Sequence, residues 1–503
     1  MLDLAAVTGL LDLFRRLLHV QPDGTRWSST GLALALVLLN LVGGDCVEDI
    51  DALEHDPGLR EFLFGLETFG LKRKERRALA KKRRAEEKRA KTGGRPLRAV
   101  PSRTTLRGFL AAFHDASEEE KREPHKAFIP APNEHLRALY GVNQGLVAFQ
   151  QKHAPQRSAT LDLDASLVET CKQVALFCYK HFRAYQPFQV YWYEQKMLLH
   201  SEFRDGNVPA GHEQLRVLQE SLAMLPDGVE HVSMRSDTAG YQWDLLKYCA
   251  EGRNERFGVI DFAVGVDVSP EFRKAVAQVA ESDWQPLLRR VNGRLVDDGQ
   301  QWAEVCFVPN DLARSKNGPE YRFLAIREPF HQTELPLPDP ATQAAKTETQ
   351  LPFPTMDLGP ASNRRRYKLF GAVTNRHEMP GADVIAWLRE RCGKSEEVHA
   401  ILKSDQAGGQ LPSKLFGANA AWWAFAVITF NLVAVLKALV LDREWANARL
   451  KRLRLHIFAL PGQVLHHARQ LIVRLPHAHP ALPWLVEIRQ TILALAASPP
   501  APA

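Results

Sequence analysis

The sequence lacks the short patterns that would assign a common chemistry at once. None of GxxxxGK[ST], HExxH or GxSxG occurs in its 503 residues. Their absence removes the usual signatures of ATP hydrolysis, zinc proteolysis and serine-hydrolase catalysis. We therefore expect a protein that uses no nucleotide cofactor.

Cysteine is scarce, and we expect no secretion signal. The six cysteines are scattered and form no CxxC pair, and the chain starts Met1-Leu2-Asp3-Leu4 without the basic residues of an export signal. Both features are typical of a protein in a reducing compartment. We predict a cytoplasmic location.

Long hydrophobic runs are also missing, with one near exception. Residues 420–435 read AAWWAFAVITFNLVAV, which is apolar for sixteen residues but contains Asn431. A membrane-spanning helix needs roughly 20 apolar residues. The run therefore predicts a buried core helix, and we expect no transmembrane segment and no membrane partner.

Positive charge is present but concentrated. The formal net charge is +7, yet residues 71–98 contain fourteen Lys or Arg and three Glu, a local net charge of +11, which leaves 7 − 11 = −4 for the remainder. Such a basic arm can neutralise DNA phosphates and release counterions. The alternatives are a solvated helical arm without a fixed partner, and a segment for targeting or membrane-surface binding. The predicted DNA contacts are Lys81, Lys82, Arg83 and Arg84.

The first 150 residues read as helices. Leu10–Leu18 has the spacing of an amphipathic helix, and Ser28-Ser29-Thr30 offers caps for the apolar run that follows. Ser102 similarly precedes an amphipathic segment of the kind that opens helices in small DNA-reading bundles. We predict a helical DNA-binding region over residues 1–150, which includes the basic arm 71–98.

The pattern changes to strands from about residue 158. Three β-rich segments follow in quick succession, and two helix-and-strand pairs come after them, in the order β-β-β-α-β-α-β. The expected strands are 159–164, 188–193, 197–203, 231–235 and 257–264, and the expected helices are 212–225 and 242–249. This order is what a ribonuclease-H-like core needs, in which the first and fourth strands are neighbours. We predict an α/β protein whose catalytic core spans 158–265 and 380–440.

The region between the two parts of the core is too long for one crossover. Residues 302–309, 321–327 and 366–374 resemble strands, and a Pro- and Thr-rich piece, 329–360, separates the last two. We predict a β-rich insertion subdomain over 266–379. A C-terminal helical region over 441–503, with a disordered tail from Ser498, is expected to follow.

Three acidic residues stand where catalytic ligands would be useful. Asp164 and Asp237, 237 − 164 = 73 positions apart, each end a predicted strand and precede small residues. Glu396 and Lys403 are seven positions apart, two helical turns on one face. Singly, each acid would more often cap a turn or lie on a solvated face, and Lys403 would form a surface ion pair. Asp162, which shares the parity of Asp164, and Glu397 remain rivals.

Two Asp and one Glu together suit a particular chemistry. Hard ions such as Mg²⁺ prefer carboxylate and water oxygens, and a pair of them activates an attacking oxygen and stabilises a leaving oxygen in phosphodiester cleavage. We expect two Mg²⁺ ions, with Mn²⁺ as a possible substitute, at Asp164, Asp237 and Glu396. Water attacks first and a 3′ hydroxyl later.

Several segments resemble those of a known family. They are LDLDAS (161–166), LLHSEFRDGNVPAGH (198–212), MRSDTAGY (234–241), RCGKSEEVHAILKSDQAGGQLPSKLFGANAAWW (391–423) and LPGQVLHHARQLIVRL (460–475). They are similar to the bacterial insertion-sequence transposases with an Asp-Asp-Glu core, closest to the group with a β-rich insertion before the glutamate. The resemblance implies binding of terminal inverted repeats, synapsis as a homodimer, cleavage of double-stranded DNA and insertion into a target. It also implies a bacterial, nucleoid-associated protein.

The resemblance is incomplete next to Glu396. Related transposases place a tyrosine seven and an arginine four residues before the glutamate, where this chain has Arg389 and Cys392. The nearest arginine is Arg391, five before, and we predict that Arg391 and Lys403 contact DNA. A transposase-derived DNA-binding protein without cleavage, or a nuclease of the same fold, remains as an alternative.

Overall fold

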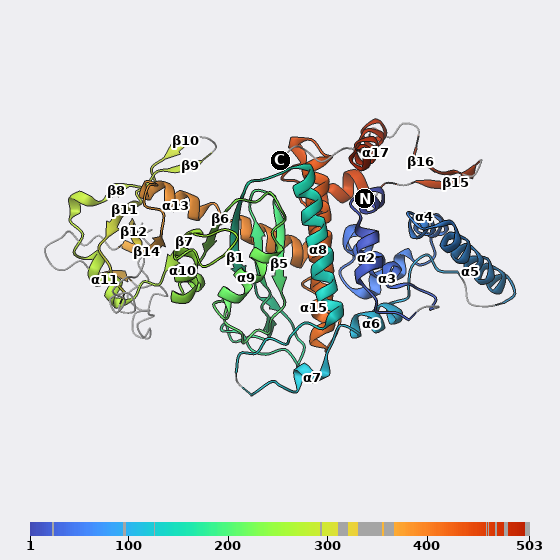
Figure 1. The fold of residues 1–503 in the computed structure, drawn as a ribbon, viewed down its shortest axis with the longest axis horizontal. Helices are drawn as coiled ribbons and strands as arrows, with labels where there is room; N and C mark the ends of the chain where they lie inside the picture. Colours follow the sequence, from blue (N-terminus) through green and yellow to red (C-terminus); the bar gives the residue numbers. More distant parts are fainter. Residues whose placement is uncertain are drawn as a thin grey trace, which may run out of the picture.

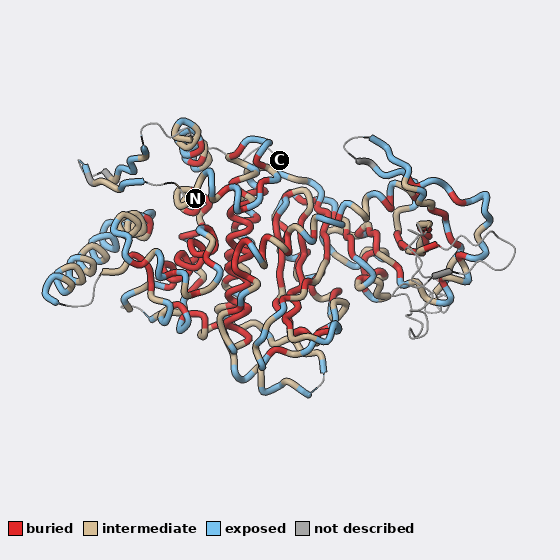
Figure 2. The backbone as a smooth tube through the Cα atoms, turned by 180° about the vertical axis from the view of Figure 1, so that it is seen from behind, coloured by how far each residue is buried: buried red, intermediate tan, exposed pale blue. Residues whose placement is uncertain are grey.

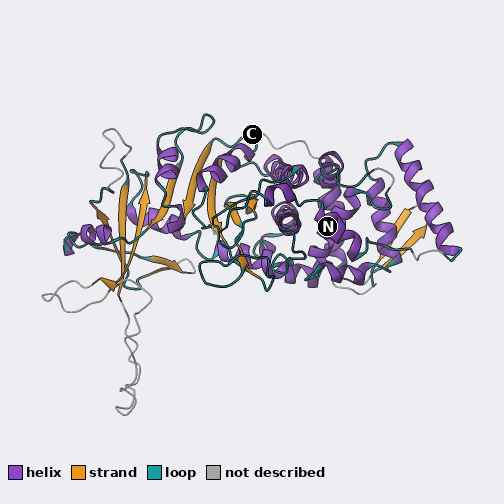
Figure 3. Cartoon of the chain, turned by 90° about the horizontal axis from the view of Figure 1, so that it is seen from below, coloured by secondary structure: helices purple, strands orange, loops and turns teal. Residues whose placement is uncertain are grey.

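The computed structural model describes residues 1–22, 25–93, 97–124, 126–291, 294–309, 320–329, 355–356, 367–458, 460, 462–467, 470–476 and 481–497. The molecule is elongated (Figure 1), with the N-terminal helices at one end, the insertion at the other and a sheet between them. Figure 3 shows the same division, because helices dominate one end and strands the other.

The N-terminal region is helical, as predicted. Polar side chains begin five of its described helices by accepting a backbone N–H: Ser28 before α3, Asp56 before α4, Ser102 before α6, Asp115 before α7 and Asn133 before α8. The helices are α1 Leu2–Val7, α2 Leu10–Leu17, α3 Ser29–Val42, α4 Pro57–Thr68, α5 Arg73–Lys91, α6 Arg103–Ala111, α7 Ala116–Glu119 and α8 Glu134–His153, with the 3₁₀ helix η1 Val47–Leu53 after α3.

The central sheet has the predicted strand order. Its members are β1 Ser158–Ala165, β4 Phe188–Trp192, β5 Met197–Glu202, β6 His231–Ser236 and β7 Asp261–Val266. They lie in the order β5-β4-β1-β6-β7; β4 is antiparallel to β1, and β6 is parallel to both β1 and β7. Helices α9 Gln214–Met224 and α10 Trp243–Ala250 provide the crossovers. This topology confirms a ribonuclease-H-like core.

Two details differ from the expected strands. A small hairpin, β2 Val168–Glu169 and β3 Ala184–Tyr185, stands between β1 and β4. The strand expected from Phe257 begins only at Asp261, because a turn occupies the preceding residues. There Asn254 Oδ1 accepts hydrogen bonds from the backbone N–H groups of Arg256 and Phe257, and Gly258 has φ +63°. An Asx-type turn of this kind ends extended pairing.

The insertion continues the central sheet. Strand β14 (Tyr367–Thr374) pairs antiparallel with β7, so that Val373 stands opposite Val264. Beyond it lie β12 Arg322–Pro329, β11 Gln301–Val305 and β8 Gln285–Pro286, while β13 Thr355–Met356 also pairs with β14. The result is one 10-stranded sheet. Of the Pro- and Thr-rich piece 329–360, residues 330–354 and 357–360 lie outside the described residues, as do residues 361–366 after it.

One helix forms the centre of the molecule. Helix α15 (Phe416–Leu439) contacts α8, α3, α6 and β5, and thus joins the sheet to the N-terminal region. It is long and apolar enough to cross a membrane, but 78% of its most apolar window is buried by the protein. Figure 2 shows the long central helices as mainly buried. The bent pair α3 and η1 passes the same test only when taken as one span.

The amide of Asn431 explains why this apolar helix contains a polar residue. The pairing of β4 with β5 shifts register between Val190 and Tyr191, which leaves Leu199 without a partner in the ladder, directly after Leu198. Asn431 Oδ1 accepts from the Leu198 N–H (2.9 Å), and its Nδ2 donates to the Leu198 carbonyl and to Asn143 Oδ1, both at 2.7 Å. The asparagine therefore satisfies buried backbone groups of the sheet.

The C-terminal region is only partly helical. It contains α16 Leu450–Leu453 and α17 Leu482–Ala497, but β15 Gln463–His467 and β16 Gln470–Arg474 form a hairpin between them. The prediction of a helical region over 441–503 is therefore wrong for this stretch. Val464, Ile472 and Val473 are β-branched residues, which favour strands. The tail 498–503 lies outside the described residues.

Candidate active site

Two of the predicted acids lie at neighbouring strand ends. Asp164 is near the end of β1, and Asp237 directly follows β6, which is parallel to β1. Asp237 accepts the Ala239 N–H (3.0 Å) and thereby starts the short 3₁₀ helix η2, Thr238–Gly240. This turn requires Gly240, since an added Cβ would lie 2.4 Å from the Ser236 Cβ. The backbone thus turns sharply directly after Asp237.

Arg391 joins these two acids. It lies just after α13 (Gly381–Arg389), and its side chain is only 9% exposed. The guanidinium Nη2 is 3.1 Å from Asp164 Oδ1 and 3.7 Å from Asp237 Oδ2. The strand-end carboxylates therefore converge on one cation.

Glu396 approaches the same centre from helix α14 (Lys394–Ala400). It is exposed, and its Oε2 accepts the Gly393 N–H (2.6 Å) at the start of the helix. Its charge is close enough to act on Asp164. Glu397 instead forms an ion pair with Lys394 (2.8 Å). The geometry therefore favours Glu396 over Glu397 as the third acid.

The charge balance at Asp164 favours an added cation. Burial raises the pKa of Asp164 to about 6, Arg391 opposes this rise, and the charges of Asp237 and Glu396 add to it. Two of the carboxylates, those of Asp164 and Asp237, share the Arg391 guanidinium, and carboxylate oxygens are ligands that Mg²⁺ prefers. The residues fit a divalent metal ion. Within the described part of the chain, however, no three His, Cys, Asp or Glu side chains are already grouped to hold one.

Asp162 has a different partner, Arg235, with which it forms an ion pair. Arg235 donates to both of its carboxylate oxygens, at 2.6 and 2.9 Å, and the Arg235 side chain is 0% exposed. The same guanidinium donates to the Trp387 carbonyl (2.7 Å) and to Glu390 (3.0 Å) on and after α13. Asp162 is therefore half of a buried ion pair, which leaves Asp164 as the acid that faces Asp237.

Lys403 and His399 line the same region. After α14 the chain continues as a π-helix, η5 Ile401–Asp405, which directs Lys403 Nζ to Ser166 Oγ (2.8 Å) and the Leu167 carbonyl (3.3 Å) beside the end of β1. His399 Nδ1 is 3.9 Å from Asp164 Oδ2. Burial, followed by Lys403 and Arg391, lowers the pKa of His399 to about 3, so the ring is neutral. Sequence reasoning missed His399, although it stands three residues after Glu396 on the same helical face.

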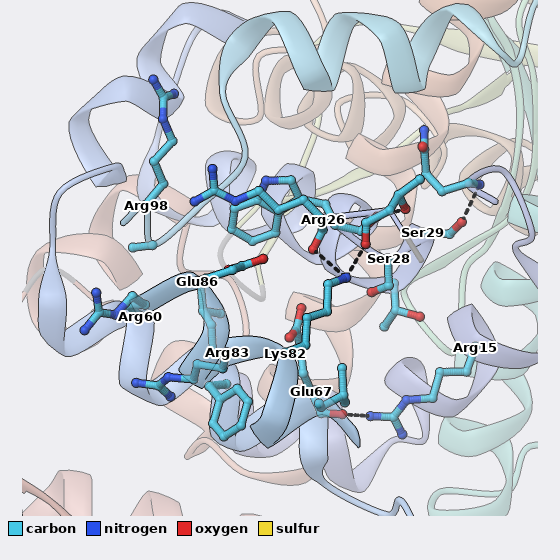
Figure 4. A pocket seen from close by; sticks show the side chains of 18 of the residues that line it. Arg15, Arg26, Ser28, Ser29, Arg60, Glu67, Lys82, Arg83, Glu86 and Arg98 are labelled. Carbon is cyan, nitrogen blue, oxygen red and sulfur yellow. Dashed lines mark hydrogen bonds between the residues drawn. The ribbon is translucent and has the colours of Figure 1, made fainter. Parts of the chain in front are cut away.

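The basic arm contributes a second surface. Helix α5 has no buried residue, and its four predicted DNA contacts divide into two pairs. Lys82 donates to the Thr25 and Arg26 carbonyls, and Arg83 bonds to Glu61 and Glu87, beside a cavity of about 460 Å³ (Figure 4). Lys81 and Arg84 are exposed. Lys82 and Arg83 thus attach the helix to the protein, while the other two face solvent.

The strand order and the acids at its centre define the class, an enzyme with a ribonuclease-H-like core. The model of the family "Transposase DDE domain group 1" matches residues 1–497, so the chain belongs to this family. It is a DNA transposase, a DNA-cleaving enzyme, which confirms the predicted resemblance to transposases with an Asp-Asp-Glu core. Enzymes of this class generally use divalent metal ions.

Solved structures are similar to the chain, and one of them is a transposase complex. It is the cryo-EM structure of the piggyBac transposase synaptic complex with hairpin DNA, at 10% sequence identity and a TM-score of 0.39. The similarity covers 90% of this chain and 80% of that chain. No curated protein matches the sequence.

Proposed function

We propose that this transposase moves an insertion sequence by a cut-and-paste reaction. It would bind the terminal inverted repeats, cleave the DNA at both ends and join the freed 3′ hydroxyls to target DNA. The observation that supports the proposal is the convergence of Asp164 and Asp237 on Arg391, within electrostatic reach of Glu396. Such a group of acids is suited to phosphodiester chemistry.

Asp164, Asp237 and Glu396 would hold two Mg²⁺ ions, which Mn²⁺ can replace. When bound, such ions supply Lewis acidity for the attacking and leaving oxygens. Side chains of the protein would bind the DNA next to these ions. Lys403, whose ammonium lies beside the end of β1, and Arg391 would bind the phosphates next to the scissile bond. His399 is neutral and so adds no positive charge next to Asp164.

The proposed division of labour follows the chain. Residues 1–150 would bind the terminal repeats, 158–265 with 380–440 would cleave, and 266–379 and 441–503 would support the DNA and the partner subunit. A homodimer would synapse the two ends. A protein with this activity would act in the bacterial cytoplasm, at the nucleoid.

The proposal is tested with a labelled duplex from the end of the element, incubated with target DNA and Mg²⁺. We expect strand-transfer products in addition to cleaved ends. Cleavage without joining would instead identify a nuclease of the same fold. Binding without either reaction would identify a transposase-derived DNA-binding protein.

The outward face of α5 should set the salt dependence of DNA binding. Each phosphate contact contributes about 0.9 to the slope of log K against log salt concentration. Replacing Lys81 and Arg84 together with alanine should therefore lower the slope by about 1.8. The measurement is a salt titration of DNA affinity by fluorescence anisotropy.

Lys82→Gln is the matched control, because Lys82 bonds to the Thr25 and Arg26 carbonyls. It should weaken the attachment of α5 to the protein and leave the slope nearly unchanged. An unaltered slope in the Lys81 and Arg84 double variant would assign the DNA contacts to another surface.

A further inference from the structure

We infer that Arg391 serves as an internal cation that occupies the acidic centre without DNA, and that bound DNA withdraws it so that metal can enter. The inference rests on the proposed function of this site. Its basis is the position of the guanidinium, 3.1 Å from Asp164 and 3.7 Å from Asp237. A side chain there stands between the carboxylates that a metal ion would have to bridge.

Arg391 is incompletely bonded in this position. Its Nε is buried and has no hydrogen-bond partner in the described structure. The contact to Asp237 is longer than a hydrogen bond. A buried donor without an acceptor costs free energy, whereas a DNA phosphate offers an arginine two parallel charge-assisted hydrogen bonds. The side chain therefore has a better partner available once DNA is present.

The third acid is also held away from a metal-binding arrangement. Glu396 Oε2 bonds to the Gly393 N–H (2.6 Å), so this carboxylate caps its own helix. Gly393 has φ +78°, which favours glycine, and an added Cβ there would meet nothing within 4 Å. The short segment from Arg391 to Glu396 thus contains a glycine in the left-handed region, with open space beside it.

These observations predict coupling between two ligands. Without DNA, a metal ion must displace Arg391 from the carboxylates, which weakens metal binding. With DNA, the phosphate takes the guanidinium and the carboxylates are free. By linkage, DNA and metal raise each other's affinity by the same factor. The chain would thereby limit metal-dependent cleavage chemistry to complexes that already contain DNA.

The test measures Mn²⁺ binding to the full chain through the electron paramagnetic resonance signal of free Mn²⁺. Without DNA, we expect Arg391→Gln to bind Mn²⁺ about tenfold more tightly than the wild type. A duplex from the end of the element should raise the wild-type affinity by a similar factor and add little to the variant. The double variant Asp164→Asn, Asp237→Asn measures Mn²⁺ bound by the DNA itself, which is subtracted.

Two further variants separate charge from position. Arg391→Lys keeps the cation and should bind Mn²⁺ as weakly as the wild type. Arg389→Gln removes a nearby arginine that bonds to Gln300 rather than to an acid, and it should leave the affinity unchanged. If Arg391→Gln does not fold, Arg391→Met, which also removes the positive charge, takes its place in the comparison.

The outcomes separate a failure of the Arg391 inference from a failure of the proposed metal site. Equal Mn²⁺ affinity in the wild type with and without DNA, or in wild type and Arg391→Gln, would overturn the internal cation and leave the metal site intact. No Mn²⁺ binding by any form, even with DNA, would overturn the proposed metal site and the inference together.

Discussion

Replacing Glu396 with glutamine should lower the rate of DNA cleavage by about a thousandfold. A metal-held carboxylate supports several kcal/mol of transition-state stabilisation, and each roughly 1.4 kcal/mol is a factor of ten in rate. Glutamine keeps an oxygen that accepts the Gly393 N–H, so α14 should still start at the same residue. Single-turnover cleavage of a labelled terminal duplex measures the rate.

Glu397→Gln is the matched control for this experiment. Glu397 is the next residue on the same helix, and its partner is Lys394 rather than a strand-end acid. Cleavage by this variant should stay within about threefold of the wild-type rate, since a partly exposed ion pair is worth only about 0–1 kcal/mol. If Glu397→Gln lost cleavage and Glu396→Gln kept it, Glu397 would be the third ligand in place of Glu396.

Replacing Arg235 with methionine should lower the free energy of unfolding by about 3–5 kcal/mol, the cost of leaving a buried charge without its partner. The variant keeps much of the side-chain volume but leaves the Asp162 carboxylate without its cationic partner. Asp162 is 2% exposed and accepts two hydrogen bonds from Arg235. It also removes the donor to the Trp387 carbonyl. Urea denaturation followed by tryptophan fluorescence measures the loss.

The double variant Asp162→Leu, Arg235→Met should regain most of that stability, because replacing a buried ion pair with apolar residues is often neutral. A double variant as unstable as Arg235→Met alone would show that Trp387 and Glu390, and not Asp162, are the partners that matter. Comparing the single and double variants thus separates the stability due to the Asp162–Arg235 ion pair from the stability due to the contacts of Arg235 with Trp387 and Glu390.

The sequence predicts the core well because local patterns determine it. The alternating apolar residues of β1 and β6, and the helical spacing between them, fix the strand order once β-α-β connections are constrained to be short and right-handed. Asp164 and Asp237 then meet because parallel neighbours end at the same side of the sheet. Their convergence follows from the topology rather than from any property of the two residues alone.

Other parts depend on contacts that no local pattern records. Asp162 and Asp164 are two residues apart and so point to the same face of β1. Only the register of β1 with β6, which sets Asp162 opposite Arg235, shows which of the two is the candidate ligand. The position of Arg391, one residue from the spacing in related transposases, becomes clear only when α13 is seen to end beside both acids. The inward turn of Lys82 and Arg83 likewise depends on distant carbonyls and Glu61.

The pairing of β14 with β7 has a consequence for shortened forms of the protein. Removing residues 266–379 would strip β7 of its neighbour and expose a row of free amide and carbonyl groups. Such an edge is a template for pairing between molecules, so the truncated enzyme would tend to aggregate however well its catalytic half folds. A minimal version of this transposase would need lysine, proline or a covering helix at β7 before it could remain monomeric.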